Sequence, residues 1–388
     1  MMHKDFFSKY PPGELVRGGQ TSYNKQKSLE EQTMHMADAL LSPAVAVTMY
    51  AASAAAAGVS LVQLRRGELA APETAKKKLP TMAVMSALVF AGQMINYTIP
   101  GTGSSGHLCG GMLLSAMLGP WAGFLSMIVI LAIQALFFAD GGLLALGANV
   151  WNMAFYGCFV GYFLIYRPLM RGNLSAGKAR LRLTLASVLG CVVTLQLGAF
   201  SVVLETTLSG ITALPLGAFA VLMQPIHLAI GLVEGLITAA VLLFVYQTRP
   251  ELLQDAAGSG AKNRCSRKAA LAILAAAALV IGGGLSLLAS SSPDGLEWSL
   301  FGNEEAGYSA NMGLDEEQYG TQSAAAEKAA AVQEKTSFLP DYGFADSDSA
   351  AGTSVSGLVG CVIVAGLAGL ICLAGSLARK KKKQTAAG

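Results

Sequence analysis

The tripeptide Met34-His35-Met36 combines residue types that can chelate a transition metal. If Met34 is the first residue of the mature chain, its α-amine, the His35 amide nitrogen and the His35 imidazole can close two fused rings on one cation. Amine and imidazole nitrogens suit nickel, copper and cobalt better than magnesium or calcium, and a planar nitrogen set favours nickel or copper over zinc. An internal Met-His-Met is instead an ordinary segment beside a membrane span, so the chelate hypothesis depends on a terminal Met34.

His107 is a second candidate ligand, and it follows the loop Gly103-Ser104-Ser105-Gly106. Glycine allows the backbone to fold closely around a ligand, and irregular backbone at membrane depth is tolerated where it lines a cavity. His107 could therefore supply a fourth nitrogen, although a lone histidine in an outer loop can also be simply solvated.

The elements that would position these residues are membrane helices. Charged residues make up 13% of the chain, against a typical ~25%, and several apolar stretches exceed the about 20 residues that cross a bilayer. We predict an all-α polytopic membrane protein of about nine transmembrane helices, seven before residue 249 and two after it. The expected spans are residues 41–64, 82–97, 108–120, 121–139, 150–166, 183–204, 226–246, 269–289 and 355–377. Residues 216–224 are apolar but end at Pro225, which indicates a re-entrant or interfacial segment.

The positions of Lys and Arg predict how the chain crosses the membrane, because cytoplasmic loops carry an excess of these residues. Basic residues follow the first, fifth and last expected spans: Arg65, Arg66, Lys76, Lys77, Lys78, Arg167, Arg171, Lys178, Arg180, Arg182 and residues 379–383. An odd number of spans with a cytoplasmic C-terminus places His35 and His107 on the same outer face. The net charge of +3 is modest, and no nucleic-acid partner is expected.

Four polar residues are candidates for the surroundings of the metal. His227 lies near the outer end of a span and could line the cavity, although a hydrogen bond within the helix bundle is the more ordinary interpretation. Asp140 and Asn149 flank a glycine-rich outer turn, where Asn149 could brace the binding loop. Ser105 belongs to the loop before the second candidate ligand.

The sequence favours a transporter subunit over an enzyme. No GxxxxGK[ST] phosphate loop occurs, so any ATP hydrolysis must belong to other chains. The enzyme alternative is a rhomboid-like intramembrane serine protease, with Ser105 of the 103–106 GSSG motif as nucleophile and His227 as base. A metal secondary carrier is a third alternative, but no inverted repeat is evident. We expect no catalytic residue and no resident cofactor, the metal ion being the cargo.

Seven motifs resemble the CbiM/NikM family, the substrate-capture subunits of cobalt and nickel energy-coupling factor transporters. They are MHMADALLSP at 34–43, GSSGH at 103–107, LGPW at 118–121, QALFFADGG at 134–142, LGAN at 146–149, HLAIG at 227–231 and EGLIT at 234–238. The resemblance implies a Ni²⁺ or Co²⁺ ion held by the amine of Met34, the amide and ring of His35, and the ring of His107. It also implies a transmembrane coupling subunit and two ATPase subunits as partners, a prokaryotic cell membrane, and a supply of metal to cobalamin biosynthesis or nickel enzymes.

The C-terminal part resembles a second family element. The segment SPDGLEW at 292–298 is similar to the PDGLE signature of small two-span, CbiN/NikN-like partner subunits. Residues 1–33 lack an apolar core and are expected to be a polar extension from an over-extended start. Residues 294–348 contain twelve acidic residues against two lysines and are expected to form an exposed, largely disordered outer loop. The remaining division is a capture domain at 34–248, a cytoplasmic linker at 249–267, a fused two-span domain at 268–378 and a basic cytoplasmic tail at 379–388.

Overall fold

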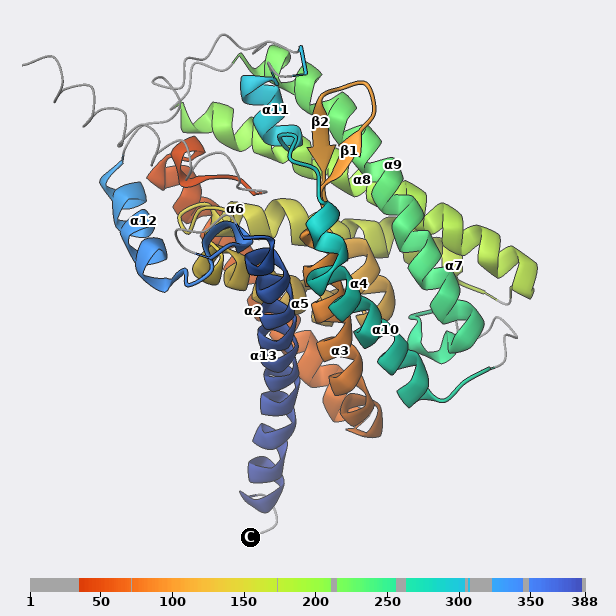
Figure 1. Ribbon diagram of the computed structural model, residues 1–388. Helices are drawn as coiled ribbons and strands as arrows, with labels where there is room; N and C mark the ends of the chain where they lie inside the picture. Colours follow the sequence, from red (N-terminus) through yellow and green to blue (C-terminus); the bar gives the residue numbers. More distant parts are fainter. Residues whose placement is uncertain are drawn as a thin grey trace, which may run out of the picture.

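The protein is built almost entirely of helices, as the computed structural model in Figure 1 shows. The structure describes residues 35–70, 72–172, 174–210, 215–255, 263–303, 306–307, 323–344 and 349–385. Met34, the expected extension at 1–33 and several stretches of the expected acidic loop lie outside these ranges.

Six helices in the described ranges are long and apolar enough to cross a membrane. Five of them are α2 (Pro43–Ala70), α5 (Pro120–Phe137), α8 (Ala176–Ser209), α9 (Leu216–Thr248) and α13 (Ala350–Thr385). The sixth is one continuous helix made of α6 (Leu146–Asn149), the π-helix η2 (Val150–Tyr166) and α7 (Arg167–Met170). The chain is therefore an all-α polytopic membrane protein, as predicted. Three more expected spans coincide with α3 (Pro72–Gln93), α4 (Gly111–Leu118) and α10 (Arg267–Gly283), which are shorter or more polar, so the total of nine stays a prediction.

The expected third span is too short to cross a bilayer alone. Helix α4 has eight residues, or about 12 Å of length, and it is buried along all of them. It ends at Gly119, whose φ of +86° suits glycine, and Pro120 begins α5, where its missing N–H is not needed. A Cβ on Gly111 would lie 3.0 Å from the Met153 carbonyl oxygen, so α4 packs backbone to backbone against η2 inside the bundle.

The expected re-entrant segment at 216–224 is wrong, because these residues form the first turns of α9. Pro225 lies inside this helix, where a proline removes one backbone hydrogen bond. Gln196 on α8 ties the two helices together at this point: its Nε2 donates to the Gln224 carbonyl at 2.8 Å, and the Gln224 side chain donates back at 3.4 Å. Support from a neighbouring helix is what allows proline within a span, and α8 and α9 lie side by side over most of their length (Figure 1).

The C-terminal part contributes helices α10 and α13, which pack against α3, and a folded cap at the opposite end from the C-terminus (Figure 1). The cap contains η4 (Leu285–Leu288), α11 (Gly295–Phe301), α12 (Ala324–Thr336) and η6 (Pro340–Tyr342). The expectation of an exposed, disordered loop is wrong for α11 and η6, because Trp298, Leu300 and Tyr342 are buried. The prediction of disorder used the acidic composition of the whole segment, to which these few apolar side chains contribute little.

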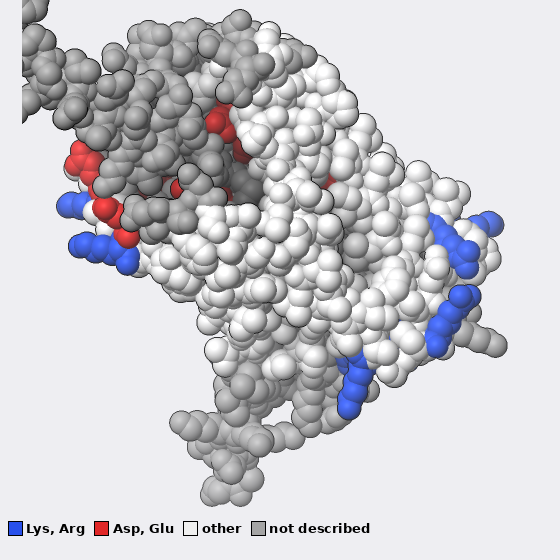
Figure 2. Space-filling view, viewed as in Figure 1, with Lys and Arg blue, Asp and Glu red and all other residues white. Residues whose placement is uncertain are grey.

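Charged side chains gather in separate regions of the visible surface. Figure 2 shows Lys and Arg at the lower right and lower centre, acidic residues with further basic ones at the left, near α12, and a few acidic atoms toward the top. Between them lies a broad face without charge. An uncharged belt of this kind is what burial in lipid requires, since ionised side chains there are costly.

Candidate metal site

Residues 35–41, the N-terminal hook, are inserted into the protein. His35 is 4% exposed and Met36 is 2% exposed. Asn149 at the end of α6 holds Met36 by both main-chain groups: the Met36 N–H donates to Asn149 Oδ1, and Asn149 Nδ2 donates to the Met36 carbonyl, each at 3.1 Å. The bracing side chain expected at Asn149 therefore acts on the residue next to His35.

The turn after α5 lets the hook approach closely because Gly141 and Gly142 have no side chains. A Cβ on Gly141 would lie 2.7 Å from the His35 Cβ, and a Cβ on Gly142 would collide with the Asp38 carboxylate. Gly141 also has a φ of +80°, which glycine adopts without strain. Asp38 Oδ1 accepts a hydrogen bond from the Ala145 N–H at 2.9 Å, and this bond fastens the middle of the hook.

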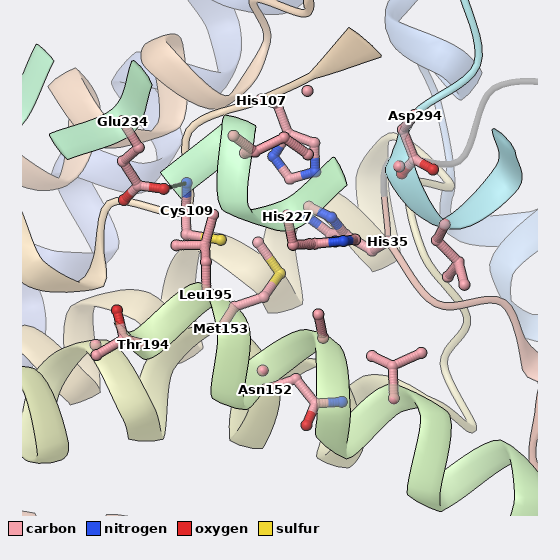
Figure 3. A pocket seen from close by; sticks show the side chains of 18 of the residues that line it. His35, His107, Cys109, Asn152, Met153, Thr194, Leu195, His227, Glu234 and Asp294 are labelled. Atoms are coloured by element: carbon pink, nitrogen blue, oxygen red, sulfur yellow. Dashed lines mark hydrogen bonds between the residues drawn. The ribbon is translucent and has the colours of Figure 1, made fainter. Parts of the chain in front are cut away.

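His107 follows a short hairpin that is held in place by α9. The hairpin consists of the antiparallel strands β1 (Tyr97–Ile99) and β2 (Ser104–Gly106). The buried carboxylate of Glu234 accepts hydrogen bonds from the N–H groups of Cys109 and Gly110, both at 2.9 Å (Figure 3). Glu234 thereby fixes the turn that directly follows His107.

The hook and the hairpin meet at one cavity, which three histidines and two acidic residues line (Figure 3). The rings of His35 and His107 have centroids 5.4 Å apart and planes inclined by 53°. Two imidazoles bound to one ion through metal–nitrogen bonds of about 2 Å have centroids roughly 4.5–6.4 Å apart. The observed separation fits two rings that share an ion, with His227 and Asp294 lining the same cavity.

Hydrogen bonds indicate which ring nitrogens keep a lone pair. His35 Nε2 lies 3.1 Å from Gln134 Oε1, a carbonyl oxygen that can only accept, so Nε2 carries the proton. His35 Nδ1 is buried and has no hydrogen-bond partner among the described residues. Nδ1 is also the ring nitrogen nearest the main chain, as a chelate with the His35 amide requires. In His227, Nδ1 donates to a carbonyl of its own helix at 2.8 Å, which leaves the lone pair on Nε2.

Side chains alone do not complete a metal site here. Within the described ranges, no three His, Cys, Asp or Glu side chains come close enough together to hold a metal ion. Two imidazoles with main-chain nitrogens are compatible with this finding. The α-amine expected from Met34 would be such a nitrogen, but Met34 lies outside the described residues.

Two other expected residues occupy different surroundings. Asp140 lies behind His35, with Oδ2 at 3.8 Å from His35 Nε2, and accepts a hydrogen bond from the Tyr342 hydroxyl at 2.6 Å. The Ser105 hydroxyl donates to the main-chain carbonyls of Ser292, at 2.7 Å, and of the next residue, at 3.2 Å. Ser105 therefore fastens the hairpin to the C-terminal part, and among the described residues no hydrogen bond to an imidazole prepares it as a nucleophile.

Three residues at the site were not among the candidates from sequence. Gln134 has a recognisable signal, because a polar side chain within an apolar span usually has a function. Asp294 accepts the Glu297 N–H at 2.8 Å as the cap of α11, and burial raises the pKa of its carboxyl to about 6. Tyr342 carries no local signal, since it lies in a segment whose acidic composition predicts solvent exposure.

The fold is that of a multi-pass membrane protein, and its cavity gathers imidazoles at one end of the helix bundle. Two family models match the chain: the cobalt uptake substrate-specific transmembrane region, CbiM, over residues 35–252, and the PDGLE domain over residues 268–376. The chain belongs to the CbiM family and carries a fused PDGLE domain, which confirms the predicted resemblance. It is a metal-transport protein and not an enzyme.

Relatives with both parts have a similar length. A protein of Archaeoglobus fulgidus that bears the name of a fused nickel transport protein, NikMN, is 35% identical over 336 residues, covering 86% of this chain and 96% of the relative. The fused nickel transport protein NikMN of Rhodobacter capsulatus is 30% identical over 293 residues, covering 72% and 80%. The cobalt transport protein CbiM of Sorangium cellulosum is 34% identical over 175 residues, covering 45% and 76%.

Proposed function

We propose that this chain is the substrate-capture subunit of an ATP-driven energy-coupling factor importer for Ni²⁺ or Co²⁺. The observation that carries the proposal is the pair of imidazoles, 5.4 Å apart, together with the buried His35 Nδ1, which has no hydrogen-bond partner in the part of the chain that the structure describes. A buried polar atom without a partner is costly, and a bound cation would use its lone pair. The nickel and cobalt in the names of the relatives support this choice of ions.

The ligand set is the α-amine of Met34, the amide nitrogen and Nδ1 of His35, and the ring of His107. A square array of four nitrogens suits nickel slightly better than cobalt. His227 would line the open side of the ion, while Asn149 and Asp140 would support the hook from behind.

The ion enters from the outer face of a prokaryotic cell membrane in this proposal. The cavity lies at the end of the bundle that carries the cap, whereas the basic ends of α7 to α10 lie away from it (Figures 1 and 2). Basic residues favour the cytoplasmic side. A separate transmembrane coupling subunit and two ATPase subunits would drive release inward, for cobalamin biosynthesis or nickel enzymes.

Metal binding by the purified full chain in lipid nanodiscs tests the proposal. Titration calorimetry should show tight binding of Ni²⁺ or Co²⁺ that His35→Ala and His107→Ala abolish. Ser105→Ala should bind like the wild type, because among the described residues its hydroxyl donates to main-chain carbonyls and not to a metal ligand. Absence of binding by the wild type, or a loss confined to Ser105→Ala, would contradict metal capture by the two histidines.

Transport separates the importer from the secondary carrier. Proteoliposomes that contain this chain alone should bind the ion without accumulating it. Accumulation without any ATPase subunit would favour the carrier.

A further inference from the structure

A chain of hydrogen bonds joins His35 to the C-terminal part of the protein. His35 Nε2 meets Gln134 Oε1 at 3.1 Å, Gln134 Nε2 donates to the Tyr342 hydroxyl at 3.2 Å, and that hydroxyl donates to Asp140 Oδ2 at 2.6 Å. All four side chains are buried. The chain therefore runs through a region from which water is excluded, where each bond depends on its neighbours.

The donors and acceptors in this chain follow one direction. The Tyr342 hydroxyl has a single proton and donates it to Asp140 Oδ2, so its oxygen is left to accept from the Gln134 amide. The carbonyl oxygen of Gln134 consequently faces His35, whose Nε2 must carry the proton. The lone pair of the imidazole is thereby assigned to Nδ1, the atom that the proposed chelate needs.

Tyr342 is held in an unusual backbone conformation for this contact. Asp341 and Tyr342 have φ values of +50° and +57°, a left-handed conformation that is strained for a non-glycine residue. The Asp341 N–H donates to the Phe138 carbonyl at 2.8 Å, and the Tyr342 ring stacks on the Phe138 ring at 4.8 Å. The end of α5, which carries Gln134, thus also fixes the segment that brings the hydroxyl to it.

We propose that Tyr342 is a positioning residue of the metal site, which orients the Gln134 amide so that His35 keeps its proton on Nε2 and offers Nδ1 to the ion. The inference rests on the proposed function and extends it: the PDGLE domain completes the capture site of its own chain. Partners of this kind behind a metal-binding histidine typically change metal affinity by about 10- to 100-fold.

Tyr342→Phe tests the inference in the full chain, because it removes the hydroxyl and keeps the ring stacked on Phe138. The Gln134 amide can then rotate and present its NH₂ group to His35 Nε2, which moves the ring proton to Nδ1. We expect Ni²⁺ affinity to fall about 10- to 100-fold. Tyr166→Phe is the matched control, because its buried hydroxyl donates to the Gln254 carbonyl at 2.9 Å, outside this hydrogen-bond chain; its affinity should equal that of the wild type.

The tautomer of His35 gives a readout that a purely structural role would not change. In ¹⁵N-histidine spectra of the metal-free protein, the His35 signal should report protonated Nε2 in the wild type and a shift toward protonated Nδ1 in Tyr342→Phe. Gln134→Met removes the amide itself. In this variant the His35 proton should likewise lose its preference for Nε2, and the experiment remains available if Tyr342→Phe folds poorly.

Two results would overturn the inference. Wild-type affinity in Tyr342→Phe, with His35→Ala still unable to bind Ni²⁺, would reject the role of Tyr342 and leave the proposed function standing. A lower Ni²⁺ affinity of Tyr342→Phe with an unchanged His35 tautomer would show that Tyr342 acts only through packing. If the wild type itself bound no Ni²⁺, the proposed function would fail first.

Discussion

Replacing Asn149 by alanine should weaken metal binding strongly, because this side chain holds the main chain beside His35. Asn149→Ala removes two buried hydrogen bonds to Met36, both 3.1 Å long. The Met36 carbonyl still accepts from the Gly142 N–H at 3.1 Å, so the Met36 N–H bears most of the penalty. A lost hydrogen bond and an unpaired buried group together cost about 2–3 kcal/mol, which corresponds to roughly 30- to 150-fold in affinity.

Asn152→Ala is the matched control for this experiment. Asn152 lines the same cavity, three residues further along, but its Nδ2 donates to Glu205 Oε2 at 2.8 Å and not to the hook. Calorimetric titration with Ni²⁺ at pH 8 should show the loss in Asn149→Ala and near wild-type affinity in Asn152→Ala. Equal affinities for Asn149→Ala and the wild type, or an equal loss in both variants, would refute the role given to the hook.

Three further results are expected. Gly142→Ala should abolish metal binding, because its Cβ would collide with the Asp38 carboxylate and lie 2.5 Å from the Asp38 nitrogen, whereas Gly58→Ala, with open space around its Cβ, should bind normally. Asp341→Asn should raise the melting temperature at pH 8. Burial and the charge of Asp140 raise the pKa of Asp341 to about 7, so the folded protein holds the Asp341 proton more tightly than the unfolded chain does. The stability that this proton gives is complete below about pH 4 and is lost as the pH rises through 7, and asparagine, which does not ionise, avoids the loss. The melting difference should shrink as the pH falls from 8 to 4, and a difference independent of pH would exclude this titration. Metal affinity should fall from about pH 8 to pH 6, because the amine and the coordinated amide must lose protons; a flat profile in calorimetry would argue against these ligands.

Local sequence predicted most of the helices and the proximity of His35 and His107. The apolar runs are long and the basic clusters are unequally distributed, so membrane helices and a shared location for His35 and His107 could be inferred from sequence. The structure places the two rings 5.4 Å apart, and their position on the outer face stays a prediction. Pro225 misled the prediction, since α9 continues through it, with support at the adjacent Gln224 carbonyl from Gln196 on the neighbouring helix. That support comes from another helix and has no trace in the local pattern.

The part of the site behind His35 could not be predicted from local pattern. Tyr342 and Asp140 are 202 residues apart in sequence, and no periodicity relates them. The contact depends on how the C-terminal part packs on α5, where a few apolar side chains outweigh the acidic composition around them. Asp294 was missed for the same reason, because a turn motif indicates a bend and not the cavity that the bend faces.

X-ray absorption at the nickel edge of the loaded protein tests the metal site most directly. We expect nitrogen ligands at about 2 Å, with outer-shell scattering from the rings of both His35 and His107. An inner shell dominated by oxygen or sulfur, or scattering from a single ring, would contradict capture of one ion by these two histidines.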